Sequence, residues 1–288
     1  YVGGRPLEET ETWRRHHSCP SGRLDEVLGT TGVVGRKVAL ATIRGDADTL
    51  TCTFASIAAE DGVLAICDAE TDSDLRRIAA ASLRVSPRSF FIGSAGLAHA
   101  VAAIEPQAVI EHRPIATSAR GALIVVGSLA ENSRAAADAL ASHGAVHVSV
   151  DPQCLLYDAN WRAALGQRVA NLLNAGADVL VAIAKSVELN LSLGPRLIAC
   201  LGEALEAATE QMSGFAATGG ETAAAILSRC GVNGIRLVDE IEPGVALGFS
   251  LGELSVPVAT KAGAFGDRLS LVRMVDRLRQ IRRKGTFT

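Results

Sequence analysis

The sequence predicts a layered α/β protein of two domains with mostly parallel, Rossmann-like sheets. The composition is the first reason: 48% of the 288 residues are apolar and only 4% are aromatic, so Ala, Val, Leu and Ile must build the core, with 28 Gly for turns. The second reason is that short apolar runs alternate with helix-like stretches along most of the chain. The third is a change near the end, where closely spaced apolar runs predict extra antiparallel strands in the C-terminal domain.

The first domain is predicted from three β-α units, because a buried parallel strand reads as an unbroken apolar run. We expect strands at residues 37–43, 63–68 and 90–93, followed by helices at residues 46–61, 72–83 and 96–104. Three such units in a row imply right-handed crossovers. The carboxylates of Asp46, Asp48, Asp72 and Asp74 fall where two of these helices begin, so we interpret them as helix-start residues.

The domain boundary is expected in a polar stretch without a clear period, residues 105–120, which contains Pro106 and Pro114. We therefore assign residues 1–115 to an N-terminal domain and residues 116–288 to a C-terminal domain.

The second domain repeats the alternation of strands and helices. Strands are expected at residues 122–126, 146–150, 178–184 and 215–218, and helices at residues 133–142, 160–174, 195–212 and 219–231. Three strands without helices between them then follow, at residues 235–239, 245–249 and 256–260. Asp267 is expected to cap a last helix that ends near Lys284.

Charge and hydropathy argue against two classes of partner. The chain has 28 Lys and Arg against 31 Asp and Glu, a net charge of −3, which argues against a nucleic-acid-binding surface. The Arg-rich last helix is read as a solvated helix whose late cations complement the helix dipole. Apolar runs are far shorter than the roughly 20 residues that cross a bilayer, and the first residues do not form a signal pattern. We expect a soluble, cytoplasmic protein.

The strongest local signal is ATGGETA at residues 217–223, where an apolar strand stops at Gly219 and Gly220 and a helix starts at once. Two residues without Cβ let backbone N–H groups approach an anion, and the helix N-terminus adds the positive end of its dipole. This pattern is typical of a phosphate site, although a tight β-α connection can produce it too.

A second strand ends in a glycine-rich turn at residues 260–267, TKAGAFGD. Lys261 can offer a point charge to a phosphate, and Gly263 permits close approach of the backbone. The alternative is an ordinary loop with a solvated lysine. Two such turns at the carboxyl ends of strands favour a nucleotide, because its phosphates are usually held from more than one loop. Ser128, after a third strand, is a weaker candidate of the same kind.

A competing pattern is GFSLG at residues 248–252, which fits the nucleophile elbow of serine hydrolases. An elbow needs a strand, a sharp turn and a helix, whereas Ser250 is followed by a segment that reaches Pro257 and reads as another strand. We therefore set aside a catalytic Ser250. The histidines have no metal-ligand spacing, so no metal ligands are assigned.

Seven short blocks occur in a specific order and spacing. They are VGGRPL at 2–7, CDAETDSDL at 67–75, GSAGL at 93–97, VVGS at 125–128, ATGGETA at 217–223, EIEPG at 240–244 and TKAGAFG at 260–266. Taken together, they resemble the four-carbon acid sugar kinase family, and the resemblance runs from Tyr1 to about Leu278.

The resemblance implies an N-terminal acid-sugar domain and a C-terminal nucleotide domain. It implies ATP-dependent phosphorylation of the terminal hydroxyl of threonate, erythronate or an oxo-tetronate, with Mg²⁺ offsetting phosphate charge. Glu221 would hold the metal or orient the attacking hydroxyl, two roles that the resemblance leaves open, and it assigns no catalytic residue. The family's ATP contacts would fall on Ser128, Gly219, Gly220, Glu221, Thr222 and Gly263.

Two departures from the family pattern are visible. Members usually begin with a strand and an Ala-Asp-Asp-Phe-Thr-Gly-Ala-like segment of the acid-sugar site, which does not occur in this sequence, although Arg5 can still reach a substrate carboxylate. After Ser128 the family commonly shows Ser, Thr and Gln, where this chain has Ala130, Ser133 and Ala136. The alternative to a kinase is therefore a non-catalytic nucleotide-binding or regulatory protein of the same fold. The sequence leaves open the acid used and whether the chain forms a homodimer.

Overall fold

The structure is a computed structural model that describes residues 6–9, 13, 21–104, 114–127, 131–184, 193–263 and 266–287. The chain divides into two compact units, residues 1–109 (unit 1) and 110–288 (unit 2), and each is described by itself. In the described part of the chain, no helix is long and apolar enough to cross a membrane.

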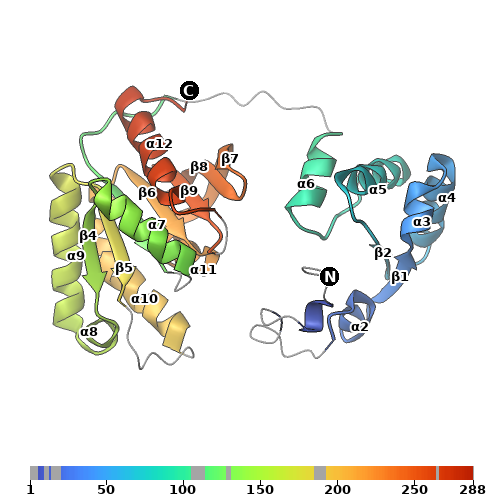
Figure 1. The fold of residues 1–288 in the computed structure, drawn as a ribbon, viewed down its shortest axis with the longest axis horizontal. Helices are drawn as coiled ribbons and strands as arrows, with labels where there is room; N and C mark the ends of the chain where they lie inside the picture. The colour runs from blue at the N-terminus through green and yellow to red at the C-terminus, as the bar shows by residue number, and fades with distance from the viewer. Residues whose placement is uncertain are drawn as a thin grey trace. The chain divides into compact units, whose positions relative to one another are not determined.

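Unit 2 is built on one seven-stranded sheet with the order β4-β5-β3-β6-β9-β8-β7 (Figure 1). The strands are β3 (Ala122–Val126), β4 (Val146–Val150), β5 (Val179–Ile183), β6 (Gly214–Thr218), β7 (Val232–Glu242), β8 (Val245–Gly252) and β9 (Pro257–Lys261). Strands β4, β5, β3, β6 and β9 are parallel, whereas β8 and β7 continue the sheet in antiparallel pairing. The predicted α/β class and antiparallel extension are confirmed.

Helices cover both faces of this sheet. They are α7 (Glu131–Ser142), α8 (Pro152–Tyr157), α9 (Ala159–Asn174), α10 (Gly194–Leu205), α11 (Gly220–Arg229) and α12 (Ser270–Lys284). One face packs against Leu173 of α9, Leu201 of α10 and Ile226 of α11. The other packs against Leu140 of α7 and Met274 of α12. Alternate residues of the strands enter these two clusters, as the twofold period of a strand requires.

The last helix corrects the expectation of a solvated surface helix. α12 begins at Ser270, and Asp267 does not cap it, since the Asp267 carboxylate accepts the backbone N–H of Leu269 before the helix. Arg282 is buried and ion-paired with Asp178, a buried residue just before β5. The cation is buried because the apolar stripe of α12 faces the sheet and brings the arginines next to it toward the interior.

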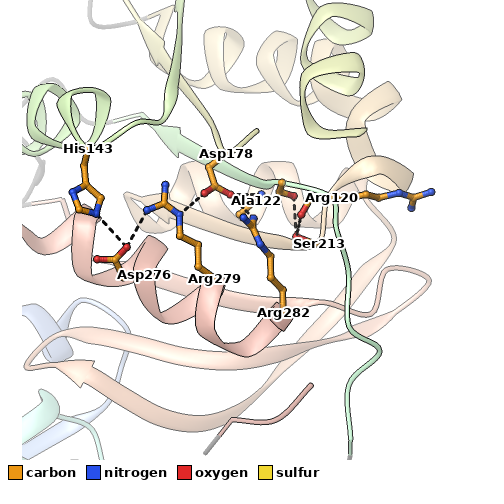
Figure 2. A network of polar contacts seen from close by, with 9 residues as sticks. Arg120, Ala122, His143, Asp178, Ser213, Asp276, Arg279 and Arg282 are labelled. Carbon is orange, nitrogen blue, oxygen red and sulfur yellow. Dashed lines mark hydrogen bonds and ion pairs between the residues drawn. The ribbon is translucent and has the colours of Figure 1, made fainter. Parts of the chain in front are cut away.

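Asp178 is the centre of a polar network on the amino-terminal side of the sheet (Figure 2). Its carboxylate accepts the backbone N–H of Ala122 at 2.8 Å and Nε of Arg279 at 2.6 Å, besides the guanidinium of Arg282. Burial would raise the pKa of Asp178, but these donors hold it below its usual value. One carboxylate thus joins the start of β3 and the start of β5 to α12.

Unit 1 contains a two-stranded parallel sheet, β1 (Val34–Val38) and β2 (Val63–Cys67), with short helical segments around it. These are the 3-10 helix η1 (Leu7–Glu9), α2 (Leu24–Gly29), α3 (Leu40–Arg44), α4 (Ala47–Ala58), α5 (Asp72–Val85) and α6 (Ala95–Ala102). A small apolar cluster that includes Ile43, Leu50, Phe54 and Ile78 joins α3, α4 and α5.

Two predicted strands of unit 1 are wrong, and so is one helix length in unit 2. The run at 37–43 leaves the strand at Val38 and continues as α3, which buries Ile43. Residues 90–93 form no strand, and Phe90 and Ile92 are exposed. Short apolar runs carry no period that separates strand from helix, which explains both errors. The helix expected at 195–212 ends at Leu205 and continues as the 3-10 helix η3, Glu206–Gln211.

The helix-start role predicted for the four acidic residues of unit 1 is confirmed. Asp48 and Asp72 lie in the first turns of α4 and α5, and Asp46 and Asp74 also cap these helices. Asp46 accepts the N–H groups of Asp48 and Thr49 at the start of α4. Asp74 forms a capping box with Thr71 and also binds the Arg44 guanidinium through two bonds of 2.9 Å. The Arg44 guanidinium holds the pKa of Asp74 well below its usual range.

This pKa shift predicts a pH-dependent stability. An unfolded aspartate titrates near pH 4, at about 3.9, so the Asp74 contribution is fully present above that pH and is lost as pH falls toward the lower folded pKa. We expect the urea midpoint of wild type to exceed that of Asp74→Asn at neutral pH, and the gap to narrow by about pH 3. Asp72→Asn, at an exposed position of the same helix start, is the control. A gap that stays constant over this range would contradict the assignment.

Candidate functional site

Three of the turns marked by the sequence lie next to one another at the carboxyl edge of the unit 2 sheet. Val126 of β3 pairs with Thr218 of β6, and Thr218 pairs with Lys261 of β9. Each strand is followed at once by Gly127, Gly219 or Ala262. Ser128 and Arg5 lie outside the described residues. The carboxyl edge of a parallel sheet is where ligands bind in open α/β folds.

The start of α11 presents uncapped backbone N–H groups at this edge. Gly219 has φ +95° and donates its N–H to the Lys261 carbonyl oxygen at 2.9 Å, and this hydrogen bond fixes the turn. Among the described residues, no side chain caps the start of α11. The first N–H groups of a helix have no acceptor within it and carry the positive end of the dipole. A Cβ built on Gly220 would meet nothing within 4 Å, so the helix start is open beside the Cα of Gly220. The arrangement suits an anion such as phosphate.

Thr222 and Glu221 have different surroundings in the first turn of α11. The Thr222 side chain is buried against Gly127, where an added Cβ would overlap its hydroxyl. Gly127 therefore lets α11 pack closely on the end of β3, and the backbone N–H of Thr222 is the group that remains for a ligand. Glu221 is exposed at the same helix start.

Lys261 is buried, with only 3% of its surface exposed, so the alternative of a solvated loop lysine is wrong. Its Nζ donates to the carbonyls of Ala262 at 3.3 Å and Gly263 at 3.4 Å. The Ser133 hydroxyl on α7 donates to the same Gly263 carbonyl at 3.0 Å. Burial lowers the pKa of Lys261, and the nearby Glu242 carboxylate opposes this shift.

The sequence did not indicate several residues that surround these turns. Ser133 departs from the family pattern, yet its hydroxyl holds the turn of Gly263. The hydroxyl of Thr218 is buried and has no hydrogen-bond partner among the described residues. Glu242, at the end of β7, binds Arg273 of α12. Only the EIEPG block at 240–244 could have indicated Glu242, and no local signal indicates Arg273.

The other candidate functional residue, Ser250, does not lie among the turns after β3, β6 and β9. Ser250 lies inside β8 and is buried, and its hydroxyl donates to the carbonyls of Leu254 and Val256 while accepting the N–H of Val256. It is a structural residue and not an exposed nucleophile. Over the described ranges, no group of three or more His, Cys, Asp or Glu side chains could hold a metal ion.

Comparisons with known proteins match both units. A family model described as a nucleotide-binding C-terminal domain matches residues 123–271, and one described as a sugar-binding N-terminal domain matches residues 1–101. The D-threonate kinase of Cupriavidus necator is 35% identical over 286 residues, which cover 94% of this chain and 67% of that protein. The D-threonate kinase of Bordetella bronchiseptica is 30% identical over 288 residues, covering 98% and 67%. This chain thus spans about two thirds of the length of these relatives.

Two solved structures share the fold. A Salmonella typhimurium LT2 protein solved as a candidate tRNA synthase superposes with a TM-score of 0.71 at 18% identity, covering 93% of this chain and 66% of its own. A Haemophilus influenzae protein of the DUF1537 group gives a TM-score of 0.65 at 19% identity, covering 96% and 68%.

The two matched domains define a class of protein that pairs a sugar-binding N-terminal domain with a nucleotide-binding C-terminal domain. The chain belongs to the four-carbon acid sugar kinase family, and the resemblance inferred from the sequence blocks is confirmed.

Proposed function

We propose that the protein transfers the terminal phosphoryl group of ATP to the terminal hydroxyl of a four-carbon sugar acid, with D-threonate as the first substrate to test. The observation that carries the proposal is the meeting of the turns after β3, β6 and β9 at one sheet edge, with the open helix start of α11 and the buried ammonium of Lys261 among them. The names of the curated relatives support the choice of acid.

The proposed binding step uses backbone groups more than side chains. The N–H groups of Gly220, Glu221 and Thr222 hold phosphate oxygens, and Gly219 and Gly263 keep the turns narrow enough for close approach. Lys261 adds a positive charge in a site of low dielectric constant, where it acts more strongly than in water. Together with Ser128 these are the residues we assign to the nucleotide.

The transfer step depends mainly on electrostatic stabilisation, because phosphoryl transfer demands little covalent chemistry from the protein. Mg²⁺ usually keeps several waters and is held by phosphate oxygens with one or two carboxylates, so a single carboxylate beside the phosphates would be enough to hold it. Bound in that way, it would offset charge on the transferred group. Glu221 is the exposed carboxylate at the helix start that would hold it or orient the sugar hydroxyl.

The test is a phosphoryl-transfer assay of the full chain with Mg·ATP and a panel of D-threonate, L-threonate and D-erythronate. We expect ADP to form in step with a phosphorylated acid, identified by ³¹P NMR, and only when the acid is present. Nucleotide binding without transfer to any acid would favour the alternative, a non-catalytic nucleotide-binding protein. Absence of both would reject the proposal.

A further inference from the structure

An alternating chain of charges connects the antiparallel part of the sheet to the turn after β9. Glu242 ends β7 and pairs with Val245, and Val245 pairs with Lys261 on the next strand. One oxygen of the Glu242 carboxylate binds the guanidinium of Arg273 on α12. Arg273 also binds Asp267 at 2.7 Å, and Asp267 is the last residue of the turn at residues 260–267. Positive and negative groups therefore alternate from Lys261 through Glu242 and Arg273 to Asp267.

The geometry around Glu242 is closely packed. Its side chain is 16% exposed, and its second oxygen, Oε1, is buried without a hydrogen-bond partner among the described residues. Gly266, with φ +77°, lies against this oxygen, because an added Cβ would stand 3.0 Å from Oε1 and would overlap the Ser270 hydroxyl. Glu242 thus lies beside the far end of the turn, and the register Glu242–Val245–Lys261 places it two strands from Lys261 at the same level of the sheet.

A buried carboxylate with one unpaired oxygen is costly unless a charge nearby compensates it. Here the compensating charges are Arg273 on one side and the Lys261 ammonium on the other. Holding a charged group in its working position before the ligand arrives lowers the cost of ordering it on binding. The β7–β8 hairpin therefore does more than extend the sheet, because it carries Glu242 to the turn after β9.

We propose that Glu242 is a positioning residue of the nucleotide site, which holds the Lys261 ammonium and Gly266 in place for the phosphates and is itself anchored by Arg273. This inference rests on the proposed function. Glu242 does not touch the nucleotide in this account, and its effect on binding passes through Lys261.

The first test is calorimetry with wild type, Glu242→Gln, Lys261→Met and the double variant, each titrated with Mg·ATP and with AMP. We expect Glu242→Gln to weaken Mg·ATP binding about tenfold and AMP binding less than about twofold, because AMP lacks the phosphates that Lys261 would hold. In the Lys261→Met background, Glu242→Gln should add less than about a twofold effect. Glu240→Gln removes a charge from an exposed position of the same strand and should leave both affinities unchanged.

Equal weakening of ATP and AMP binding, or the same loss of ATP affinity in the presence and absence of Lys261, would overturn the proposal, since either result indicates a general disturbance of the fold.

A second measurement needs no nucleotide. The chain has four lysines, so the ¹³C-lysine resonance of Lys261 can be assigned with the Lys261→Met variant. Glu242→Gln should lower the pKa of Lys261, and an unchanged pKa would overturn the positioning role. If wild type binds no Mg·ATP, the proposed function fails, and this titration alone decides whether Glu242 acts on Lys261.

Discussion

Replacing Lys261 by methionine is expected to lower kcat/KM for phosphoryl transfer by about 100-fold, the loss typical when one fixed charge-stabilising donor is removed from an active site. The ammonium is buried at the strand end beside the open start of α11, where little water screens its charge. Methionine has a similar length and suits a buried position, so the fold should remain intact. The measurement is steady-state kinetics with Mg·ATP and the acid substrate.

Lys284→Met is the matched control for this variant. It removes the same charge from an exposed position in the last turn of α12 and should leave kcat/KM unchanged. Thermal unfolding of both variants establishes that they are folded. A Lys261→Met protein that keeps kcat/KM within about threefold of wild type would exclude a role for Lys261 in the transfer.

Replacing Asp178 by alanine is expected to destabilise unit 2 by about 3–5 kcal/mol, the usual cost of removing one partner of a buried ion pair. The substitution leaves Arg282 buried without its carboxylate, and it removes the acceptor of the Ala122 N–H at the start of β3. The measurement is urea unfolding followed by the fluorescence of Trp161, which packs against the unit 2 core. A Trp13→Phe background removes the second tryptophan from the signal.

Asp276→Ala is the control on the same network. Asp276 binds Arg279 at 3.0 Å and His143 at 3.3 Å, but its side chain is 51% exposed, so its removal should cost less than about 1 kcal/mol. Figure 2 shows the two aspartates on either side of Arg279. Equal losses of unfolding free energy for Asp178→Ala and Asp276→Ala would contradict the claim that burial gives Asp178 the larger contribution to stability.

The sequence predicts the parallel core of unit 2 well because its inner strands β3 and β6 are buried on both faces, whereas the edge strand β4 alternates between buried and exposed positions. Residues 122–126 and 146–150 are predicted to the residue, and all five positions of β3 are buried. The failures fall where burial is incomplete or depends on distant partners. Residues 37–43 look like one strand, but Ile43 joins the core cluster from a helix and Arg44 meets Asp74, 30 positions away. Such long-range contacts leave no local period.

The candidate site, like the fold, has residues that the sequence predicts and residues that it does not. Glycine-rich turns after strands carry a local signal, because backbone approach and a positive φ at Gly219 restrict the residue type. The residues that support these turns carry no local signal in the sequence. Ser133 and Gly263 are 130 positions apart, and Arg273 meets Glu242 from another element. The burial of Lys261 was likewise invisible, because it depends on how the hairpin and α12 pack around the end of β9.

The central claim is that the turns at the carboxyl edge of unit 2 bind the phosphates of a nucleotide, and calorimetry of Mg·ATP binding tests it most directly. Gly219 and Gly144 have φ values of +95° and +96°, so an alanine at either position is strained. Gly144 precedes β4 and so lies at the opposite edge of the sheet, with nothing within 4 Å of an added Cβ.

We predict micromolar binding by wild type, about −8 kcal/mol, with Gly144→Ala retaining it and Gly219→Ala losing at least about tenfold, both variants being folded at the temperature of the titration. Equal affinities for the two variants, or no binding by the folded wild-type chain, would contradict the account.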